Sequence, residues 1–147
     1  ASGSTRDSRK DIGYGIYDEL DFEVITETAG DVEARIKVRI GEVAQSLKLV
    51  RQLISKLRRN AETQLAVELG ELQQEEGHFT WGISESARGD NLHCLLLDKE
   101  GRIDRLLVRS ASYPNWPALT VAVQGDIIPD FPLINKSFEL CYACIDR

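Results

Sequence analysis

The sequence predicts a mainly helical α+β fold, and three observations lead to this prediction. Apolar residues recur at alternating spacings of four and three across residues 31–59, which is typical of a long amphipathic helix in a bundle. Short alternating runs across residues 79–109 predict a small antiparallel β-hairpin region. The chain has 147 residues, which suits one domain. We therefore expect a flexible arm (1–12), a helical region (30–76) and a hairpin region that continues to the C-terminal residues (78–147).

The composition limits the classes of partner and of compartment. The chain carries 24 acidic and 18 basic residues, a net charge of -6, which argues against nucleic acid as a partner. No apolar run approaches the roughly 20 residues that span a membrane, and the polar opening does not resemble a signal peptide. Three cysteines suggest a reducing compartment. Methionine is absent, which indicates a processed chain or a piece of a longer one.

The N-terminal residues combine charges with aromatic side chains. Residues 1–12 are polar, and we expect a flexible, solvated arm unless a partner orders it. An apolar-rich stretch follows from Tyr14 to Val24. We interpret it as an irregular segment with a short strand near Phe22–Ile25.

The long helix is predicted to begin at Asp31, whose carboxylate suits an N-cap. At about 1.5 Å per residue, residues 31–59 span roughly 42 Å. We expect this helix to pack in a bundle and to be long enough to brace a larger assembly. The apolar residues that define its packing face are Ile36, Ile40, Val43, Leu47, Val50, Ile54 and Leu57.

The hairpin region follows a segment with a weaker pattern. Residues 60–77 show weak helical periodicity, and residues 79–83 alternate like a strand. Residues 92–97 and 103–108 flank Asp98-Lys99-Glu100-Gly101, and the glycine supplies the positive φ that a hairpin turn needs.

The C-terminal part contains four prolines that limit its backbone. Residues 116–123 predict a short helix with Pro117 in its first turn. Residues 129–132, Pro-Asp-Phe-Pro, predict an extended loop, because a residue before proline is biased away from helical backbone. Residues 133–138 then lead to the C-terminal motif.

Two cysteines three positions apart, Cys141 and Cys144, form the most informative motif of the chain. On a helical turn two such sulfurs lie on one face and can contact one metal centre. A pair alone cannot complete a tetrahedral or bimetallic site, so the spacing is compatible with half a metal site, a redox dithiol or two incidental thiols. A self-contained zinc site is disfavoured, because Cys94, His78 and His93 are the remaining candidate ligands and their spacing is irregular.

A second candidate cluster, residues 85–93, precedes the predicted hairpin. Arg88 stands before a glycine and can project a fixed guanidinium into a cavity, and His93 can donate to a ligand or a carboxylate. The alternative is an exposed turn arginine and a packed histidine. These residues taken alone favour that alternative.

Three segments resemble one protein family. Residues 7–10 together with 14–24 are similar to a stretch shared by hydrogenases and complex I subunits. Residues 30–52 resemble the long helix after it, and residues 137–147 resemble a C-terminal metal motif. Over essentially its whole length the chain resembles the C-terminal portion of a nickel-iron hydrogenase large subunit of the formate hydrogenlyase (hydrogenase-3 and -4) type. That type is related to the 49 kDa subunit of complex I.

The resemblance implies roles for five residues. Cys141 would be a terminal nickel ligand, and Cys144 would be a sulfur that bridges nickel and iron. Arg88 would be the catalytic arginine whose guanidinium overhangs the metals. His93 and Glu139 would contact these groups from outside the metal site and adjust their orientation and charge. Soft thiolates suit nickel and low-spin iron, so the implied chemistry is consistent with the residue types.

The resemblance also implies a fold, a function and partners. The fold would be that of hydrogenase large subunits and the complex I 49 kDa subunit. The function would be that of the catalytic large subunit of a membrane-associated hydrogenase, which interconverts hydrogen with protons and electrons. Expected partners are an iron-sulfur small subunit, the membrane subunits of a complex I-like assembly and the N-terminal part of the same large subunit. The expected location is cytoplasmic, peripherally attached to the inner face of the cell membrane.

The cysteine count limits what the isolated chain can do. In the family a second cysteine pair completes the nickel-iron centre, and this chain has three cysteines in all. We therefore expect the full-length parent to hold the nickel-iron centre, and the isolated chain to bind no cofactor and to be inactive.

Departures from the family pattern keep alternatives open. Glu139-Leu140 stands where relatives commonly have Asp-Pro, Ala87 where proline precedes the arginine, and Arg147 where many have histidine. The alternative function is a non-catalytic coupling module of a complex I-like (NADH:quinone oxidoreductase-related) assembly. A stand-alone dithiol redox protein is a third interpretation.

Overall fold

The structure is a computed structural model that describes residues 1–59 and 78–145. A long helix and a three-stranded antiparallel sheet confirm the predicted α+β fold. The weak helical pattern expected at residues 60–77 lies outside the described residues. The α-helices and strands are α1 (Ser8–Asp11), α2 (Val32–Arg59), β1 (Phe79–Ser86), β2 (Gly89–Leu97), β3 (Ile103–Arg109), α3 (Trp116–Ala122) and α4 (Phe131–Phe138).

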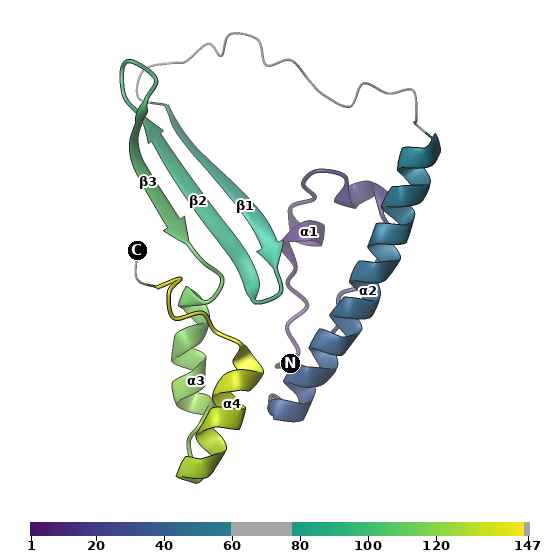
Figure 1. Cartoon of the computed structure of the whole chain (residues 1–147), viewed down its shortest axis with the longest axis vertical. Coiled ribbons are helices and arrows are strands. Elements are labelled where there is room, and N and C mark those ends of the chain that lie inside the picture. Colours follow the sequence, from purple (N-terminus) through teal and green to yellow (C-terminus); the bar gives the residue numbers. More distant parts are fainter. Residues whose placement is uncertain (60–77, 146–147) are drawn as a thin grey trace.

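The elements form an open arrangement (Figure 1). The sheet and α2 diverge from each other, and the N-terminal segment with α1 lies between them. Helices α3 and α4 pack side by side beyond one end of the sheet, and α4 also contacts α2. After α4 the described chain, up to residue 145, returns toward the end of β3. Among residues 1–59 and 78–145, no helix has the length and apolar character needed to cross a membrane.

The N-terminal residues, expected as a flexible arm, make specific contacts in the structure. Asp7 caps α1 by accepting a hydrogen bond from the backbone N–H of Arg9 at 3.0 Å. The backbone N–H of Ser8 donates to the carboxylate of Glu85 in β1 at 2.9 Å. A backbone bond from Gly3 to the carbonyl of Glu27 holds the first residues in place. This segment therefore links the sheet to the chain that leads into α2.

One face of α2 packs on the segment that precedes it. Asp31 accepts from the backbone N–H of Ala34 at 2.7 Å, which confirms the predicted N-cap. Leu49 forms the core with Leu20 and Phe22, and all three are buried. The short strand predicted near Phe22–Ile25 is wrong.

The physical reason is that the partner of this segment is a helix. The backbone N–H of Asp21 donates to the side-chain carbonyl of Gln52 at 2.9 Å, and the Gln52 amide donates back to the Asp21 carbonyl at 2.6 Å. A glutamine on α2 therefore supplies the hydrogen bonds that a neighbouring strand would otherwise provide.

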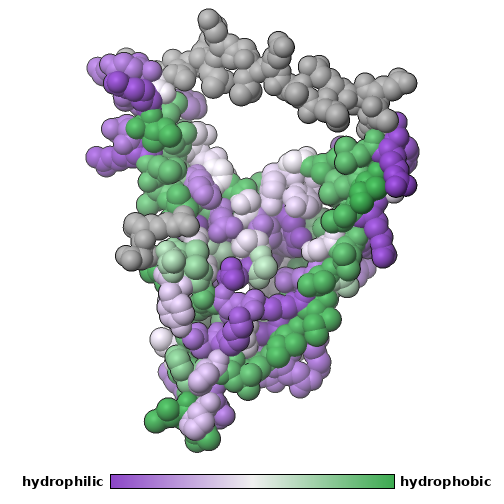
Figure 2. Space-filling view, viewed as in Figure 1, coloured by the Kyte–Doolittle hydropathy of each residue, from purple (hydrophilic) through white to green (hydrophobic). Residues whose placement is uncertain are grey.

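The predicted packing face of α2 points outward in the structure. Its seven apolar side chains, which we call the α2 stripe, are between 45% and 66% exposed. Figure 2 shows hydrophobic residues running along α2 on the visible face. The stripe consists of Ile36, Ile40, Val43, Leu47, Val50, Ile54 and Leu57. The expected bundle packing is therefore not made within the described residues.

The sheet has the order β1-β2-β3, and both pairings are antiparallel. The hairpin predicted between residues 92–97 and 103–108 is confirmed, with Gly101 at φ 74° in its turn. A second hairpin joins β1 to β2 through Ala87 and Arg88, because Ser86 pairs with Gly89. Gly89 has φ 116°, which favours glycine there.

The C-terminal part is more helical than predicted. The short helix expected at residues 116–123 is confirmed as α3. The extended loop expected at residues 129–132 is wrong, because Pro129 lies in a 3-10 turn and Pro132 in the first turn of α4. First-turn amides have no partner within a helix, so proline is tolerated there.

Candidate metal-thiolate site

The two cysteines of the C-terminal motif lie on the turn that follows α4. Glu139 ends the helix with a left-handed backbone (φ 52°, ψ 34°), and this redirects the chain before Cys141. Hydrogen bonds from the side chain and the backbone of Cys144 lower the pKa of the Cys141 thiol. The positive charge of Arg88 acts in the same direction. The two sulfurs are therefore neighbours, and Cys141 favours the thiolate form that binds metals.

Two serines after β3 hold the backbone of both cysteines. The hydroxyl of Ser112 accepts from the N–H of Cys141 at 3.1 Å, and the hydroxyl of Ser110 donates to the carbonyl of Cys144 at 3.1 Å. Both serines are buried, with exposed fractions of 2% and 6%. Sequence reasoning missed them. The only signal for them was a run of small residues directly after a strand, Ser-Ala-Ser.

Arg88 reaches the same turn from the β1–β2 hairpin. Its Nε donates to the backbone carbonyl of Glu139. The side-chain amide of Asn115 donates to the carbonyl of Arg88 at 2.7 Å and so anchors the hairpin tip on the start of α3. Arg88, Glu139 and Cys141 line one pocket of about 510 Å³. The predicted arginine therefore lies beside the predicted thiol.

The carboxylate of Glu139 lies among cations. Its oxygens are 3.2 Å from Lys136 Nζ and 3.9 Å from Arg39 Nε. The hydrogen bond from Lys136 lowers the pKa of Glu139, and the charge of Arg39 adds to this effect. Glu139 therefore stays ionised next to the thiol turn.

An aromatic contact holds the far side of the turn. Tyr142 packs on Trp116 with 4.8 Å between ring centroids. Its hydroxyl accepts from the side-chain amide of Asn135 at 2.7 Å. The turn is thus fastened to both α3 and α4.

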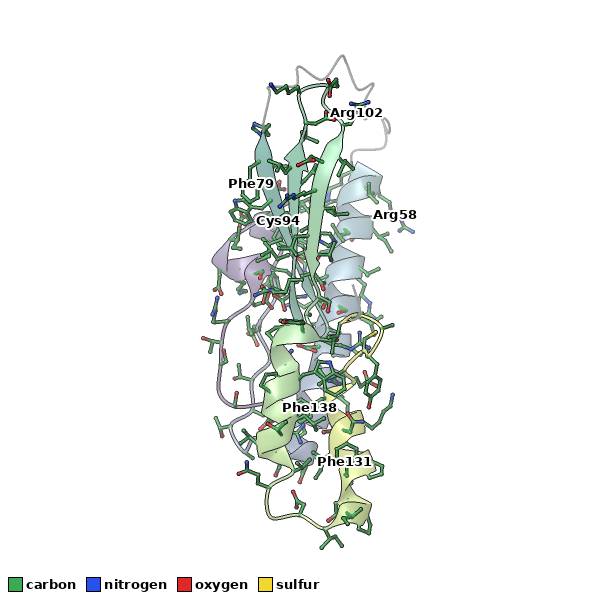
Figure 3. The ribbon with its side chains drawn as sticks, turned by 90° about the vertical axis from the view of Figure 1, so that its left-hand side faces the viewer. Arg58, Phe79, Cys94, Arg102, Phe131 and Phe138 are labelled. Atoms are coloured by element: carbon green, nitrogen blue, oxygen red, sulfur yellow. The ribbon has the colours of Figure 1, made fainter. Side chains whose placement is uncertain are left out.

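The other three candidate ligands lie elsewhere. His78 is exposed and directly precedes β1, where its carbonyl accepts from the backbone N–H of Leu97 at 3.2 Å. His93 is in the middle of β2, opposite Gly82 and Val108, and its side chain is exposed. It does not line the pocket that contains Arg88 and Cys141. Figure 3 shows Cys94 within the sheet, away from α4.

The donor set of the site is therefore a pair of thiols. Among residues 1–59 and 78–145, no group of three or more His, Cys, Asp or Glu side chains is placed to hold a metal ion. Of the five predicted site residues, the structure brings together Arg88, Glu139, Cys141 and Cys144. Two adjacent soft thiols fit half of a thiolate metal centre.

Comparison with known proteins gives consistent results. Residues 1–147 match the family described as the 49 Kd subunit of respiratory-chain NADH dehydrogenase. Formate hydrogenlyase subunit 5 of Escherichia coli (strain K12) is 36% identical, over 100% of this chain and 25% of its own length. The carbon monoxide-induced hydrogenase of Rhodospirillum rubrum is 34% identical, over 99% and 39%. An NADH-quinone oxidoreductase component of Salinispora tropica is 35% identical, over 100% and 38%.

A solved structure shares the fold. It is described as the membrane-bound sulfane sulfur reductase, an archaeal respiratory membrane complex, and one of its chains is 27% identical with a TM-score of 0.86. The match covers 99% of this chain and 40% of that chain. The chain thus spans between 25% and 40% of the length of these four relatives.

Proposed function

The chain belongs to the family of the 49 kDa subunit of respiratory-chain NADH dehydrogenase, and on this basis we propose that it is part of the catalytic large subunit of a membrane-associated nickel-iron hydrogenase. Relatives named as hydrogenases and relatives named as NADH-quinone oxidoreductase components both match over its whole length. The observation that favours the hydrogenase is the pair of neighbouring thiols, Cys141 and Cys144, with Arg88 beside them.

The thiols fit half of the proposed centre. Cys141 and Cys144 would each hold the nickel-iron centre through a thiolate. The other thiolates would come from residues outside this chain. When bound, a nickel-iron centre supplies the Lewis acid and the redox couple needed to split hydrogen.

The residues of this chain prepare the site for that chemistry. Ser110 and Ser112 fix the backbone of the two cysteines, so that the sulfurs are held before a metal arrives. Arg88 favours the thiolate of Cys141 and presents a cation at the pocket. Overall, hydrogen would yield two protons and two electrons.

The proposed assembly follows from the same assignment. The electrons would leave through an iron-sulfur small subunit. Membrane subunits would hold the complex at the inner face of the cell membrane. We expect the isolated chain to bind no nickel, because two thiolates do not complete the centre.

The test uses cysteine variants of the native complex. We expect Cys141→Ser and Cys144→Ser to remove nickel and hydrogen-dependent dye reduction, because each variant deletes a ligand. Cys94→Ser is the matched control, since Cys94 lies in the sheet, and it should retain both properties. Full dye reduction by the Cys141→Ser complex would refute the hydrogenase assignment.

A second candidate is a non-catalytic coupling module of a complex I-like assembly. The observation that favours it is the 35% identity to an NADH-quinone oxidoreductase component, together with Glu139-Leu140 in the C-terminal motif. The sequence of the full-length gene separates the two candidates. A second Cys-x-x-Cys upstream of Ala1 supports the hydrogenase, and the same fold without it supports the coupling module.

A further inference from the structure

Two arginines from distant parts of the chain cap the end of α4. Arg39 of α2 donates to the carbonyl of Phe138 at 2.8 Å, and Arg88 of the β1–β2 hairpin donates to the carbonyl of Glu139. The last carbonyls of a helix have no partner within it, and cations are favourable there. The two capped carbonyls belong to the residues three and two positions before Cys141, so the cap lies where the chain enters the thiol turn.

The capped residue has an unfavourable backbone. Glu139 is the only non-glycine residue with positive φ among residues 1–59 and 78–145. A side chain with Cβ adopts this left-handed conformation reluctantly, so neighbouring contacts must stabilise it. Arg39 contributes twice, because its guanidinium bonds the preceding carbonyl and lies 3.9 Å from the Glu139 carboxylate.

Neighbouring contacts between α2 and α4 hold Arg39 in place. One turn earlier on α2, Arg35 donates to the hydroxyl of Ser137 at 2.8 Å and lies 4.1 Å from the centre of the Phe138 ring. These contacts fasten α2 to α4. Arg39 Nε is buried, has no hydrogen-bond partner within the described part of the chain, and lies 3.9 Å from a carboxylate oxygen of Glu139.

We infer that Arg39 is a positioning residue for Cys141, which it orients by holding Glu139 in the left-handed conformation that starts the thiol turn. The inference rests on the proposed function only in that the positioned thiol is a metal ligand. Its structural content concerns the geometry of the turn. It can therefore be tested without metal.

The first experiment measures the accessibility of single thiols. The full-length large subunit is prepared without metal and alkylated with iodoacetamide at a pH where thiols are ionised, so that accessibility sets the rate. Peptide mass spectrometry follows Cys141, with Cys94 as an internal reference. For Arg39→Ala we expect about tenfold faster alkylation of Cys141, the change in a local opening equilibrium when one charged hydrogen bond is lost. The rate at Cys94 should not change.

Four further variants sharpen the result. The alkylation rate of Cys141 in Arg39→Lys should fall between those of wild type and Arg39→Ala. An ammonium keeps the positive charge, but it cannot contact the Phe138 carbonyl and the Glu139 carboxylate together as the guanidinium does. Arg58→Ala is the matched control. Arg58 lies in the last turn of α2, far from Phe138 of α4 (Figure 3), so this variant should show the wild-type alkylation rate at Cys141. In the double variant Arg39→Ala/Glu139→Gly, the alkylation rate of Cys141 should be close to that of Glu139→Gly alone. Glycine adopts the left-handed backbone freely, so it does not need Arg39 to hold that conformation.

The outcomes separate positioning from a general structural role. An unchanged rate at Cys141 in Arg39→Ala, or an equal increase at Cys94, would overturn the inference. In the native complex, Arg39→Ala should lower nickel content and hydrogen-dependent dye reduction by about 10- to 100-fold, as expected for a residue that supports a ligand. If the wild-type complex contains no nickel, the proposed function fails, and the alkylation pattern still decides the role of Arg39.

Discussion

Gly41 lies in the middle of α2 against the extended segment that precedes the helix, and Gly41→Ala sets two opposing effects against each other. Alanine favours a helix over glycine by about 1 kcal/mol. The new Cβ, however, would lie 2.7 Å from Ile25 Cγ2 and 3.1 Å from Ile25 Cγ1. Overpacking of this kind costs about 1–3 kcal/mol. We therefore expect Gly41→Ala to lower the free energy of unfolding by about 1 kcal/mol.

The matched background is Ile25→Ala, which removes both of the nearest atoms and leaves a Cβ at an ordinary contact distance of 3.4 Å. In that background Gly41→Ala should raise the free energy of unfolding by about 1 kcal/mol, so the two positions couple by about 2 kcal/mol. Urea unfolding followed by circular dichroism measures all four proteins. A gain of about 1 kcal/mol from Gly41→Ala alone would refute the packing of this segment on α2.

Three further predictions concern single side chains. Leu49→Ala should cost about 2–5 kcal/mol in urea unfolding, whereas Leu47→Ala in the exposed α2 stripe should change stability by less than about 0.5 kcal/mol. Burial opposes ionisation of Asp7, but hydrogen bonds from Arg9 lower its pKa below 3.8. The stability that ionised Asp7 contributes is therefore complete above pH 3.8 and is lost as the pH falls through its folded pKa. In acid unfolding measurements, the difference in free energy of unfolding between wild type and Asp7→Asn should shrink over that pH range. Ser112→Ala should lower the melting temperature, because it leaves the half-buried backbone N–H of Cys141 without its acceptor.

The sequence predicted the elements whose signals are local. Asp31 is an N-cap because its carboxylate reaches the first free amides, and that rule needs no knowledge of the remaining chain. Gly101 identifies the β2–β3 turn by its positive φ. The segment at Phe22–Ile25 was misjudged because an alternating apolar pattern indicates burial of one side but not the kind of partner. Pro132 was misjudged because two local rules for proline compete, and tertiary packing decides between them.

The site was predictable only in part, for a related reason. Cys141 and Cys144 are close in sequence, so their spacing alone suggested a shared role. Arg88 is far from them in sequence, and the resemblance to hydrogenases, rather than any pattern, placed it nearby. Ser112 and Arg39 act through backbone carbonyls and amides of the turn. Such contacts leave no signature in residue type, because the groups they bind are present at every position.

Helix α2 connects the site to the rest of the proposed assembly. Near its start, Arg35 and Arg39 hold the end of α4 that leads into the thiol turn. Along its length it presents the α2 stripe, whose side chains are at least 45% exposed, and exposed apolar patches favour an interface. Under the proposed function, the remainder of the large subunit would be the partner that covers the stripe, since these relatives are longer than this chain. Such a partner would fix the helix from which Arg39 is proposed to position Cys141, and it would also supply the missing thiolates. Loss of the partner would therefore remove ligands and orientation together, which is the physical basis for expecting no nickel in the isolated chain.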